Sequence, residues 1–555
     1  MVLNAYTAEQ ITATEKPHLA AGAPLMARAA HALAVEAARM LRHRPSGAYG
    51  ADVVVLAGSG NNGGDALHAG ALLRARGARV TAVLTGSEAH EEGLADLRGA
   101  GGFVLGLGEA GAPACARAAA CADLIIDGML GTGGRGGLRE APAELVRRIQ
   151  ESTGRNTEHR NTEHRSAGHR STGGWARPLV LACDVPSGLD ATTGAVAGPV
   201  LAADATVTFI GIKSGLLATP KPSLVGRIRC ADLGIGADLP APALREAEEE
   251  DFPRYWSLPV EGDQKYSRGV LGTVAGSDQY PGAGLMCVHA AVRAGAGMVR
   301  FVGGDALASA LAVSTPEAVR SEHVGAHRVQ AWAVGSGATD RAQQAQVEQA
   351  LDAGVPVLAD AAAIEMLAHR AADGDPAPAH VLLTPHAGEL AQALEWVARL
   401  APERGERLVR AAREAGLPED EEVQTSPSRA QIEAAPFVWV RAAREALGGT
   451  LLLKGTTTLV AAPDGTVWAH RGNSAWLSTA GSGDTLSGIL GAGLAAHWAR
   501  VEAGRAEGAD GEWAGVAAAG LLVQRGISTA APGPVPPTVA AERIPEVLGR
   551  LADGQ

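Results

Sequence analysis

The 555-residue sequence predicts an α/β protein with two domains, each built on a parallel sheet that helices cover on both faces. Two observations indicate this class. Short runs rich in Val, Ile and Leu alternate with helical patterns in both halves, as buried parallel strands and crossover helices do. A Pro-containing acidic segment lies between the halves and indicates a domain boundary.

In the first half, the pattern predicts a helix over 25–41, a strand over 51–58 and a helix over 66–77 that ends at Gly77. The later strands of this series are predicted at 79–86, 122–130, 178–188 and 203–211. Because strands and helices alternate, the strands should pair in parallel.

The segment 151–175 breaks this alternation. The sequence NTEHR occurs at 156–160 and again at 161–165, and a degenerate copy, SAGHR, follows. This composition favours a polar surface loop that repetition has lengthened. The three histidines of the repeats make metal binding the alternative interpretation.

The acidic segment at 237–252 leads us to expect a first domain over 1–236, a linker over 237–258 and a second domain over 259–555. In the second domain, strands are predicted at 269–277, 298–304, 355–360 and 380–389, and a helix at 284–297. A further strand and a hairpin that turns at Pro-Asp-Gly are predicted over 448–469. The charged stretch 400–432 should add helix and loop.

Composition excludes several function classes. The net charge of −12 and the 3% share of aromatic residues argue against nucleic-acid partners and against an anionic membrane surface. The five cysteines are scattered, which favours a reducing compartment over a disulfide framework. Neither a signal peptide nor an apolar run of about 20 residues is visible, so we expect a cytoplasmic protein.

The turn GSGNNGGD at 58–65 is the first candidate site. It follows a predicted strand and precedes a helix, so its backbone N–H groups can bind an anion at the helix N-terminus. Its spacing is not that of the dinucleotide fingerprint, and it lacks the lysine of a P-loop. An ordinary tight turn is the alternative interpretation.

Two further polar turns follow strands, at 125–137 and 181–194. Ligands of open α/β sheets bind at the carboxyl ends of the strands, so the three turns should converge on one crevice. Asn62, Asp127 and Ser187 offer oxygen ligands that suit a monovalent or other hard cation. Asp184 would lie beside them and could act on a proton.

The motifs GSGNNGGD, DGMLGTGGRG, CDVPSGLD and ADATVTF with its later lysine resemble the YjeF N-terminal domain, the NAD(P)H-hydrate epimerase family, over about residues 1–236. The resemblance implies a Rossmann-like three-layer sandwich in which Asn62, Asp127 and Ser187 hold potassium and Asp184 is catalytic. It implies that these residues contact the hydrated nucleotide: Asn61, Asn62, Gly63, Gly64, Asp65, Gly131, Thr132, Gly133, Gly134, Arg135, Gly136, Gly137 and Asp184. Ala66 stands where this family usually has Gly.

The turn AGSGD at 480–484 is the second candidate site, because it runs into an apolar helix with a single carboxylate, Asp484. Its peptide N–H groups can cradle phosphate oxygens. A carboxylate there would be repelled by phosphate unless it takes a proton from a hydroxyl that attacks phosphorus. Lys454, His386 and Glu389 follow other predicted strands of this half. A helix N-cap is the alternative role of Asp484.

The second half resembles the ribokinase-like ADP- or ATP-dependent NAD(P)H-hydrate dehydratase family over about residues 259–550, on the motifs GSDQYPGAGLMCVHAAVRAGAGMV, TPEAV, TPHAGE, LLKGTTT and AGSGDTLSGIL. The resemblance implies Mg²⁺, ADP as co-substrate and Asp484 as the base. The residues implied to face the hydrate are Ala283, Gly337, His386 and Asp484. Those implied to face the nucleotide are Lys454, Gly455, Thr456, Thr457, Thr458 and Gly483. The sequence departs from the family pattern at Gln264, at Ala480 and in GSGATD at 335–340, where GPGLG is usual.

Together the resemblances imply a bifunctional repair enzyme. The first domain interconverts the R and S forms of hydrated NADH and NADPH (NADHX and NADPHX), and the second uses ADP to dehydrate the S form. We expect only these small-molecule partners, and a homo-oligomer.

Two alternatives stay open. The second half fits any ribokinase-like kinase of a small hydroxylated metabolite, although GNNGGD in the same chain argues against such a kinase. One half could instead be a degenerate, non-catalytic nucleotide-binding module, an interpretation that Ala66 and Gln264 keep open.

Overall fold

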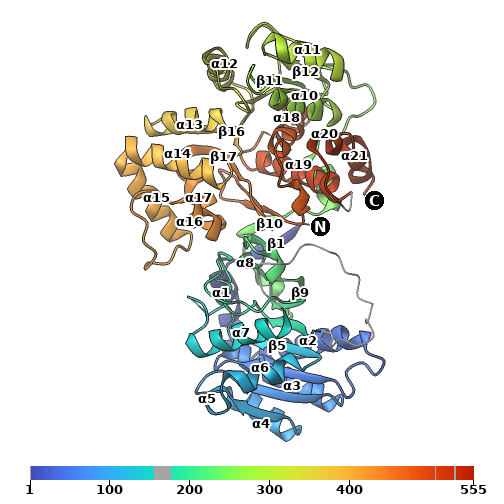
Figure 1. Ribbon diagram of the computed structural model, residues 1–555, viewed down its shortest axis with the longest axis vertical. Helices are drawn as coiled ribbons and strands as arrows, with labels where there is room; N and C mark the ends of the chain where they lie inside the picture. The colour runs from blue at the N-terminus through green and yellow to red at the C-terminus, as the bar shows by residue number, and fades with distance from the viewer. Residues whose placement is uncertain (1, 135, 155–176, 507, 531–532, 555) are drawn as a thin grey trace. The chain divides into compact units, whose positions relative to one another are not determined.

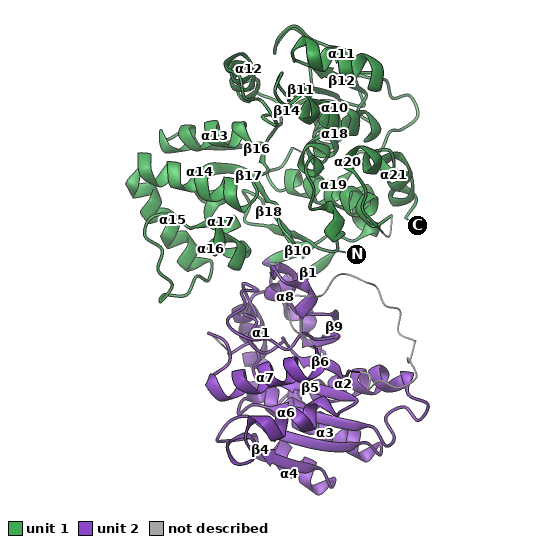
Figure 2. Cartoon of the chain, viewed as in Figure 1, with its two compact units in different colours: residues 1–3, 244–555 green, residues 4–243 purple. Residues whose placement is uncertain are grey.

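The computed structural model describes residues 2–134, 136–154, 177–506, 508–530 and 533–554. The chain divides into two compact units, one of residues 4–243 and one of residues 1–3 with 244–555 (Figures 1 and 2). Among the described residues, no helix combines the length and the apolar character needed to cross a membrane.

The units divide after Ala243, inside the predicted linker 237–258. The predicted linker segment contains strand β10 (Leu244–Glu246) and helix α9 (Phe252–Tyr255). The side chain of Phe252 is fully buried in the core of the 244–555 unit. Prolines and acidic residues therefore mark the boundary, while the apolar residues between them belong to the second unit.

The 4–243 unit contains a fully parallel seven-stranded sheet in the order β4-β3-β2-β5-β6-β7-β9. Its strands are β2 (Asp52–Ala57), β3 (Arg79–Leu84), β4 (Phe103–Gly106), β5 (Leu124–Gly128), β6 (Leu179–Cys183), β7 (Ala205–Phe209) and β9 (Arg227–Ala231). The strand order reverses between β2 and β5. At such a point the loops leave the sheet in opposite directions and open a crevice at the carboxyl ends of the strands.

Helices cover both faces of this sheet, as predicted. Val53 and Val55 of β2 share a core with α2 (Leu25–Met40) and α3 (Asn61–Ala75). Val54, on the opposite face of the sheet, packs instead against α6 (Ala112–Ala120) and α7 (Glu140–Thr153). Alternate side chains of one strand thus enter two different cores, which is the signature of a buried parallel strand. The unit is a three-layer sandwich.

A further parallel pair joins β1 (Leu3–Tyr6) to β8 (Ile212–Lys213). Helix α1 (Ala8–Ala20) follows β1, with Thr7 and Gln10 forming a capping box at its start. This pair places Lys213, the last residue of β8, under the loops of the main sheet.

In the other unit, ten strands follow the order β13-β12-β11-β14-β15-β16-β17-β18-β19-β10. They are β11 (Val270–Val274), β12 (Met298–Phe301), β13 (Val319–Arg320), β14 (Ala331–Val334), β15 (Val357–Ala359), β16 (Ala377–Leu383), β17 (Gly448–Leu453), β18 (Thr458–Ala461), β19 (Val467–His470) and β10. Neighbours from β13 to β17 are parallel, and β17, β18 and β19 are antiparallel. Here the order reverses between β11 and β14.

One large core joins this sheet to several helices, among them α10 (Pro281–Arg293), α18 (Ser482–Glu502) and α19 (Glu512–Thr529). Other helices pack on the strands outside that core: α12 (Arg341–Leu351), α13 (Ala362–Ala372) and α17 (Pro436–Leu447), with α14 (Ala387–Leu400) and α15 (Pro402–Glu414) against them (Figure 1). The predicted mixed α/β fold with a parallel sheet is confirmed in this unit too.

The differences from the predicted elements are local. Helix α3 begins at Asn61 rather than at residue 66, because the glycine-rich turn itself forms the first helical turn. Strand β14 was not predicted, since only four apolar residues mark it. The predicted hairpin between β18 and β19 is confirmed. Helix α7 extends to Thr153, so the predicted loop 151–175 starts later, and its repeats lie outside the described residues.

Candidate active sites

The glycine-rich turn after β2 lies directly against the end of β5. The Gly58 N–H donates to the carbonyl of Gly128 at 3.1 Å. A Cβ atom on Gly58 would lie 2.0 Å from the Met129 oxygen, and one on Gly63 would lie 2.0 Å from the Gly58 oxygen. No side chain caps the first turn of α3, so its N–H groups remain available to an anion.

Asn62 ties this turn to two other strands. Its Nδ2 donates to the Cys183 carbonyl at the end of β6, at 2.9 Å. A Cβ atom on Gly131, in the loop after β5, would lie only 2.2 Å from Asn62 Oδ1. The loops after β2, β5 and β6 therefore meet at the side chain of Asn62, as predicted from the strand order.

Asp127 and Ser187 form the buried floor of this site. Ser187 Oγ donates to Asp127 Oδ1 at 2.6 Å, and its N–H donates to Oδ2 at 2.9 Å. Burial raises the pKa of Asp127, and the two bonds from Ser187 oppose that rise. The Leu130 N–H donates to Ser187 Oγ at 2.9 Å, which links the pair to the loop that also contacts Asn62.

Asp184 is held in a strained conformation beside a lysine. Its φ of 68° lies in the left-handed region, which non-glycine residues rarely adopt outside functional sites. Its carboxylate is ion-paired with Lys213, which is 1% exposed, and it accepts a hydrogen bond from Thr208 Oγ1 at 3.1 Å. Lys213 Nζ also donates to the Phe209 carbonyl at 2.8 Å. Buried charges persist only when they are paired in this way.

Two more carboxyl groups face this ion pair. Burial, and then the charges of Asp184 and Glu15, raise the pKa of Asp65 to about 8, while Lys213 opposes the rise. Burial also raises the pKa of Glu15, with Lys213 opposing and Asp184 adding to the rise. At neutral pH Asp65 therefore holds its proton beside the paired carboxylate of Asp184. A protonated acid beside an ion-paired carboxylate can serve as a general acid.

The remaining predicted residues of this site occupy the same turns. Gly64 packs against the His90 ring, and Asn61 is exposed at the start of α3. Gly136 and Gly137 have positive φ, and a Cβ atom on Gly137 would lie 2.3 Å from the Ala197 carbonyl oxygen. Thr132, Gly133 and Gly134 lie in the loop after β5. Arg135 lies outside the described residues.

The methyl group of Ala66 is fully buried against Gly128. A Cβ atom on Gly128 would lie 2.6 Å from the Ala66 Cβ, so the absence of a side chain at 128 makes room for it. The departure at Ala66 is thus accommodated without disrupting the turn.

In the other unit, Asp484 lies in the first turn of α18 and does not cap it. The helix begins at Ser482 after Gly481, whose φ is 90°, and no side chain caps its N–H groups. The alternative role as an N-cap is therefore wrong. The half-buried carboxyl group of Asp484 and the open N–H groups share one helix end, as the phosphate-cradle interpretation requires.

Lys454 lies beside this turn. A Cβ atom on Gly483 would lie 3.8 Å from Lys454 Nζ. The Lys454 N–H donates to the Pro385 carbonyl at 2.8 Å, which brings the loop after β17 to the start of α14. Burial lowers the pKa of Lys454, but Asp360 and Glu389 more than compensate, so the pKa lies above its usual value. The ammonium therefore stays charged beside Gly483.

His386 caps α14 with one ring nitrogen. Its Nδ1 accepts from the N–H groups of Gly388 and Glu389 at 3.0 and 3.2 Å, and Glu389 Oε2 accepts from the His386 N–H at 2.8 Å. Because Nδ1 accepts, the neutral ring carries its proton on Nε2. The side chain is 57% exposed, and its Nε2 lies 3.7 Å from Glu389 Oε2, which is beyond hydrogen-bond distance.

The other predicted residues of this site divide into two groups. A Cβ atom on Gly337 would lie 2.9 Å from the Ala283 Cβ, so these two residues are in contact. Gly455 and Thr456 are exposed in the turn between β17 and β18, whereas Thr457 and Thr458 are buried. Thr458 Oγ1 donates to the Gly455 carbonyl at 3.3 Å, so this hydroxyl stabilises the turn itself.

Sequence reasoning missed several residues that the structure places in these sites, namely Glu15, Ser336, Asp360 and Thr384, and it gave no role to Lys213, the lysine after ADATVTF. Asp360 could have been found, because it ends a predicted strand just as Asp127 and Asp184 do. Burial and the charge of Asp360 raise the pKa of Asp484, while Ser336 and Lys454 oppose the rise. No local pattern marks Glu15, which lies on an ordinary amphipathic helix.

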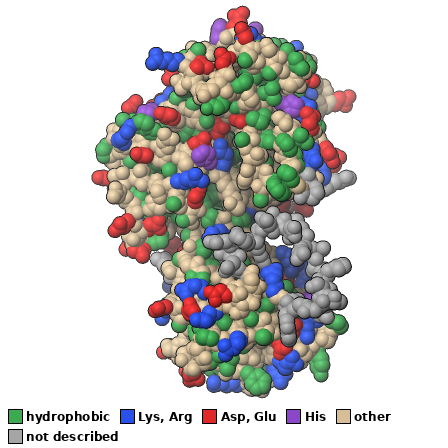
Figure 3. All heavy atoms as spheres, in the orientation of Figure 1, with side chains coloured by type: hydrophobic (Ala, Val, Ile, Leu, Met, Phe, Trp, Pro, Cys, Tyr) green, Lys and Arg blue, Asp and Glu red, His purple; other side chains and the backbone are tan. Residues whose placement is uncertain are grey.

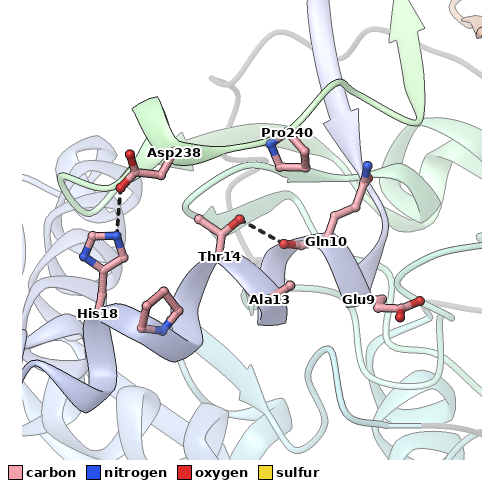
Figure 4. A pocket seen from close by; sticks show the side chains of 8 residues that line it. Glu9, Gln10, Ala13, Thr14, His18, Asp238 and Pro240 are labelled. Carbon is pink, nitrogen blue, oxygen red and sulfur yellow. Dashed lines mark hydrogen bonds and ion pairs between the residues drawn. The ribbon is translucent and has the colours of Figure 1, made fainter.

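A hollow on the 4–243 unit lies between α1 and the segment near 238–240 (Figure 4). The His18 ring nitrogen Nε2 lies 2.8 Å from Asp238 Oδ2 at one end of it. None of the predicted site residues lines this hollow. On the face in Figure 3, acidic and basic side chains are interspersed over both units, without the single-signed patch that a nucleic acid would need.

Comparison with known proteins gives two family matches. Residues 22–215 match the model described as YjeF-related protein N-terminus, and residues 271–533 match that of NAD(P)H-hydrate dehydratase. Both ranges lie within the resemblances at 1–236 and 259–550.

The chain is 38% identical over 497 residues to the bifunctional NAD(P)H-hydrate repair enzyme Nnr of Mycobacterium tuberculosis, covering 88% of this chain and 89% of that protein. It is 39% identical over 233 residues to an NAD(P)H-hydrate epimerase of Microbacterium testaceum, covering 42% of this chain and 78% of that protein. A solved ADP/ATP-dependent NAD(P)H-hydrate dehydratase of Bacillus subtilis is 22% identical with a TM-score of 0.41, covering 55% and 97% of the two chains.

The raised pKa of Asp65 should make stability depend on pH. Between its ordinary value of 3.8 and about 8, the unfolded chain binds fewer protons than the folded chain, so stability falls as pH rises. Asp65→Asn removes this dependence. We expect the variant to raise Tm over the wild type, and by more at pH 8 than at pH 5.

Thermal unfolding of both proteins across this pH range measures the effect. Glu88→Gln, a change at an exposed acid of the same unit, should give a Tm difference that does not vary with pH. A Tm difference for Asp65→Asn that is equal at both pH values would show that Asp65 is ionised throughout.

Proposed function

The chain belongs to the family of bifunctional NAD(P)H-hydrate repair enzymes, and we propose that each of its units performs one of that family's two reactions. The 4–243 unit interconverts the R and S forms of hydrated NADH and NADPH. The 244–555 unit dehydrates the S form with ADP and releases AMP and phosphate. The observation that carries this proposal is the uncapped first turn of α18, with Asp484 and Gly483 beside Lys454.

In the 4–243 unit, epimerisation requires that a bond to the hydroxyl-bearing carbon break and re-form, with one proton given and one taken. Asp65, which holds a proton, and Asp184, paired with Lys213, supply such a pair. The open N–H groups at the start of α3 bind a phosphate of the nucleotide.

Asn62, Asp127 and Ser187 fit a potassium ion, because they offer an amide oxygen, a buried carboxylate and a hydroxyl with a single negative charge. The ion would supply positive charge next to a phosphate-bearing substrate. Within the described residues, no group of three His, Cys, Asp or Glu side chains could hold a metal ion.

In the 244–555 unit, Asp484 takes the proton of the substrate hydroxyl as its oxygen attacks the terminal phosphorus of ADP. AMP leaves, and the N–H groups at the start of α18 and the Lys454 ammonium stabilise the charge that develops on the phosphoryl oxygens. Phosphate then leaves with the former hydroxyl oxygen, the neighbouring ring carbon gives up a proton to solvent, and the ring double bond re-forms. His386 Nε2–H can donate to the hydrate.

Magnesium suits this step as an ion held chiefly by the ADP phosphates and water, because Mg²⁺ usually uses only one or two carboxylates of the protein. It would neutralise charge on the phosphates. The homo-oligomer and the cytoplasmic location stay predictions.

An equal mixture of the R and S hydrates tests both units together. With ADP, Mg²⁺ and K⁺, we expect complete recovery of the 340 nm absorbance, because the R form is converted as the S form is consumed. Half recovery would mean that only the dehydratase works. Accumulation of a phosphorylated product in place of free phosphate would favour the rival kinase of a hydroxylated metabolite.

Asp484→Asn should abolish ADP-dependent recovery, because the amide cannot take the hydroxyl proton. Loss of a general base usually costs about 10²–10⁴-fold in rate. Epimerisation, followed by the R-to-S ratio of recovered hydrate, should be unchanged in the same protein. Normal ADP-dependent turnover in this variant would show that another group is the base.

Gly131→Ala should stop epimerisation, because its Cβ would lie 2.2 Å from Asn62 Oδ1 and displace the side chain that joins three loops. Gly108→Ala is the matched control, since nothing lies within 4 Å of a Cβ at that position of the same unit. The measurement is recovery of the R hydrate with excess wild-type dehydratase. If the two variants were equally active, the position of the Asn62 side chain would not matter for epimerisation.

A further inference from the structure

Asp360 is the meeting point of four neighbouring strands. It directly follows β15, and its Oδ2 accepts from Ser336 Oγ, after β14, at 2.8 Å. Its Oδ1 accepts from Thr384 Oγ1, after β16, at 2.9 Å and from Lys454 Nζ, after β17, at 2.8 Å. Three donors from three loops therefore converge on one carboxylate that is 5% exposed. Such a fully bonded buried carboxylate has one orientation.

The backbone around Asp360 is equally constrained. A Cβ atom on Gly335 would lie 2.0 Å from the Asp360 carbonyl oxygen, so the loop after β14 passes directly over it. Ala361 follows with a φ of 46°, a strained value for a residue with a side chain. Strain of this kind persists only where the surroundings impose it, and here it aims the carboxylate at the strand ends.

The Lys454 ammonium depends on Asp360 for its charge. Lys454 Nζ lies 2.8 Å from Asp360 and 3.8 Å from Glu389 Oε2. Without these carboxylates, burial alone would favour a neutral amine. Asp360 thus keeps the charge, and its hydrogen bond sets the position of Nζ next to Gly483.

The charge of Asp360 also acts on the base. Burial and then the charge of Asp360 raise the pKa of the half-buried Asp484, while Ser336, whose hydroxyl donates to Asp360, opposes that rise. The carboxylate that holds the phosphate-facing lysine therefore also makes Asp484 a better proton acceptor.

We propose that Asp360 is a positioning residue for phosphoryl transfer: it holds the Lys454 ammonium at the phosphate cradle of α18, the helix end that carries Asp484. It touches neither the substrate nor the nucleotide and acts through Lys454. The ligand it prepares for is a nucleoside diphosphate, whose terminal phosphate would lie between Lys454 and the N–H groups of α18. This inference rests on the proposed dehydratase function.

Charged and titratable groups from several elements surround Asp360. They are Lys454 after β17, Glu389 and His386 at the start of α14, Asp484 on α18 and Cys287 on α10. Removing the negative charge of Asp360 lowers the pKa of both Lys454 and Asp484.

Asp360→Asn in the full-length protein tests the proposal. We expect kcat/KM for ADP to fall by at least about tenfold, the usual effect of losing a hydrogen bond to a charged group. Both limbs of the pH–rate profile should move to lower pH, because Asp484 and Lys454 then lose their protons more readily. A uniform loss at every pH, with the limbs unmoved, would mean that Asp360 only supports the fold and would overturn the proposal.

A double-mutant cycle shows whether Asp360 acts through Lys454. Lys454→Met should weaken ADP binding, measured by titration calorimetry, and Asp360→Asn should add little in the Lys454→Met background. If the two substitutions instead weakened ADP binding independently, so that their fold-effects multiplied in the double variant, the proposal would be overturned. Asp352→Asn, at an exposed acid of the same unit, is the control.

Calorimetry of ADP binding tests the positioning role of Asp360 independently of whether the protein dehydrates the hydrate. If wild-type protein binds ADP but yields no NADH from the hydrate, the proposed function fails, while the coupling of Asp360 to Lys454 in ADP binding still decides the positioning role. Thr384→Val, which removes one donor and leaves the charge, should weaken ADP binding less than Asp360→Asn.

Discussion

The reversal of strand order in each parallel sheet is the constraint on which both sites depend. Between β2 and β5, and again between β11 and β14, neighbouring loops depart in opposite directions, so their backbones can contact each other and still leave a crevice. The Gly58 N–H meets the Gly128 carbonyl in one unit, and the Gly276 N–H meets the Ser336 carbonyl at 2.7 Å in the other. The glycines at these crossings are needed because a side chain would have no space.

Each crevice then contains one buried lysine among several carboxyl groups. Lys213 faces Asp184, Asp65 and Glu15, and Lys454 faces Asp360, Glu389 and Asp484. One cation cannot neutralise three neighbouring acids, and in each set one acid, Asp65 or Asp484, has a raised pKa. Burial and excess negative charge thus leave an acid in each crevice that holds its proton more tightly than usual.

The sequence predicted most of the fold and the residues that lie in local motifs, including Asn62, Asp127, Asp184 and Asp484. These could be found because a glycine-rich turn after an apolar strand is a local signal. Glu15 could not, since its contact with the Asp184 site arises only when α1 packs under β8. The start of α3 was misplaced because glycine has a low helix propensity in helix interiors, whereas the first turn tolerates it. The contacts of Asp360 depend on the register of four strands, which no single segment encodes.

The separate apolar cores of the two units have a consequence for damage by heat. Because Leu33 and Val146 pack only within the 4–243 unit, and Ile489 and Leu521 only within the other, each unit can melt at its own temperature. A chain warmed between the two transitions would keep one crevice intact while the other is lost. If the 4–243 unit melts first, the S epimer of the damaged cofactor continues to be cleared while the R epimer accumulates, whereas loss of the other unit first would stop repair of both.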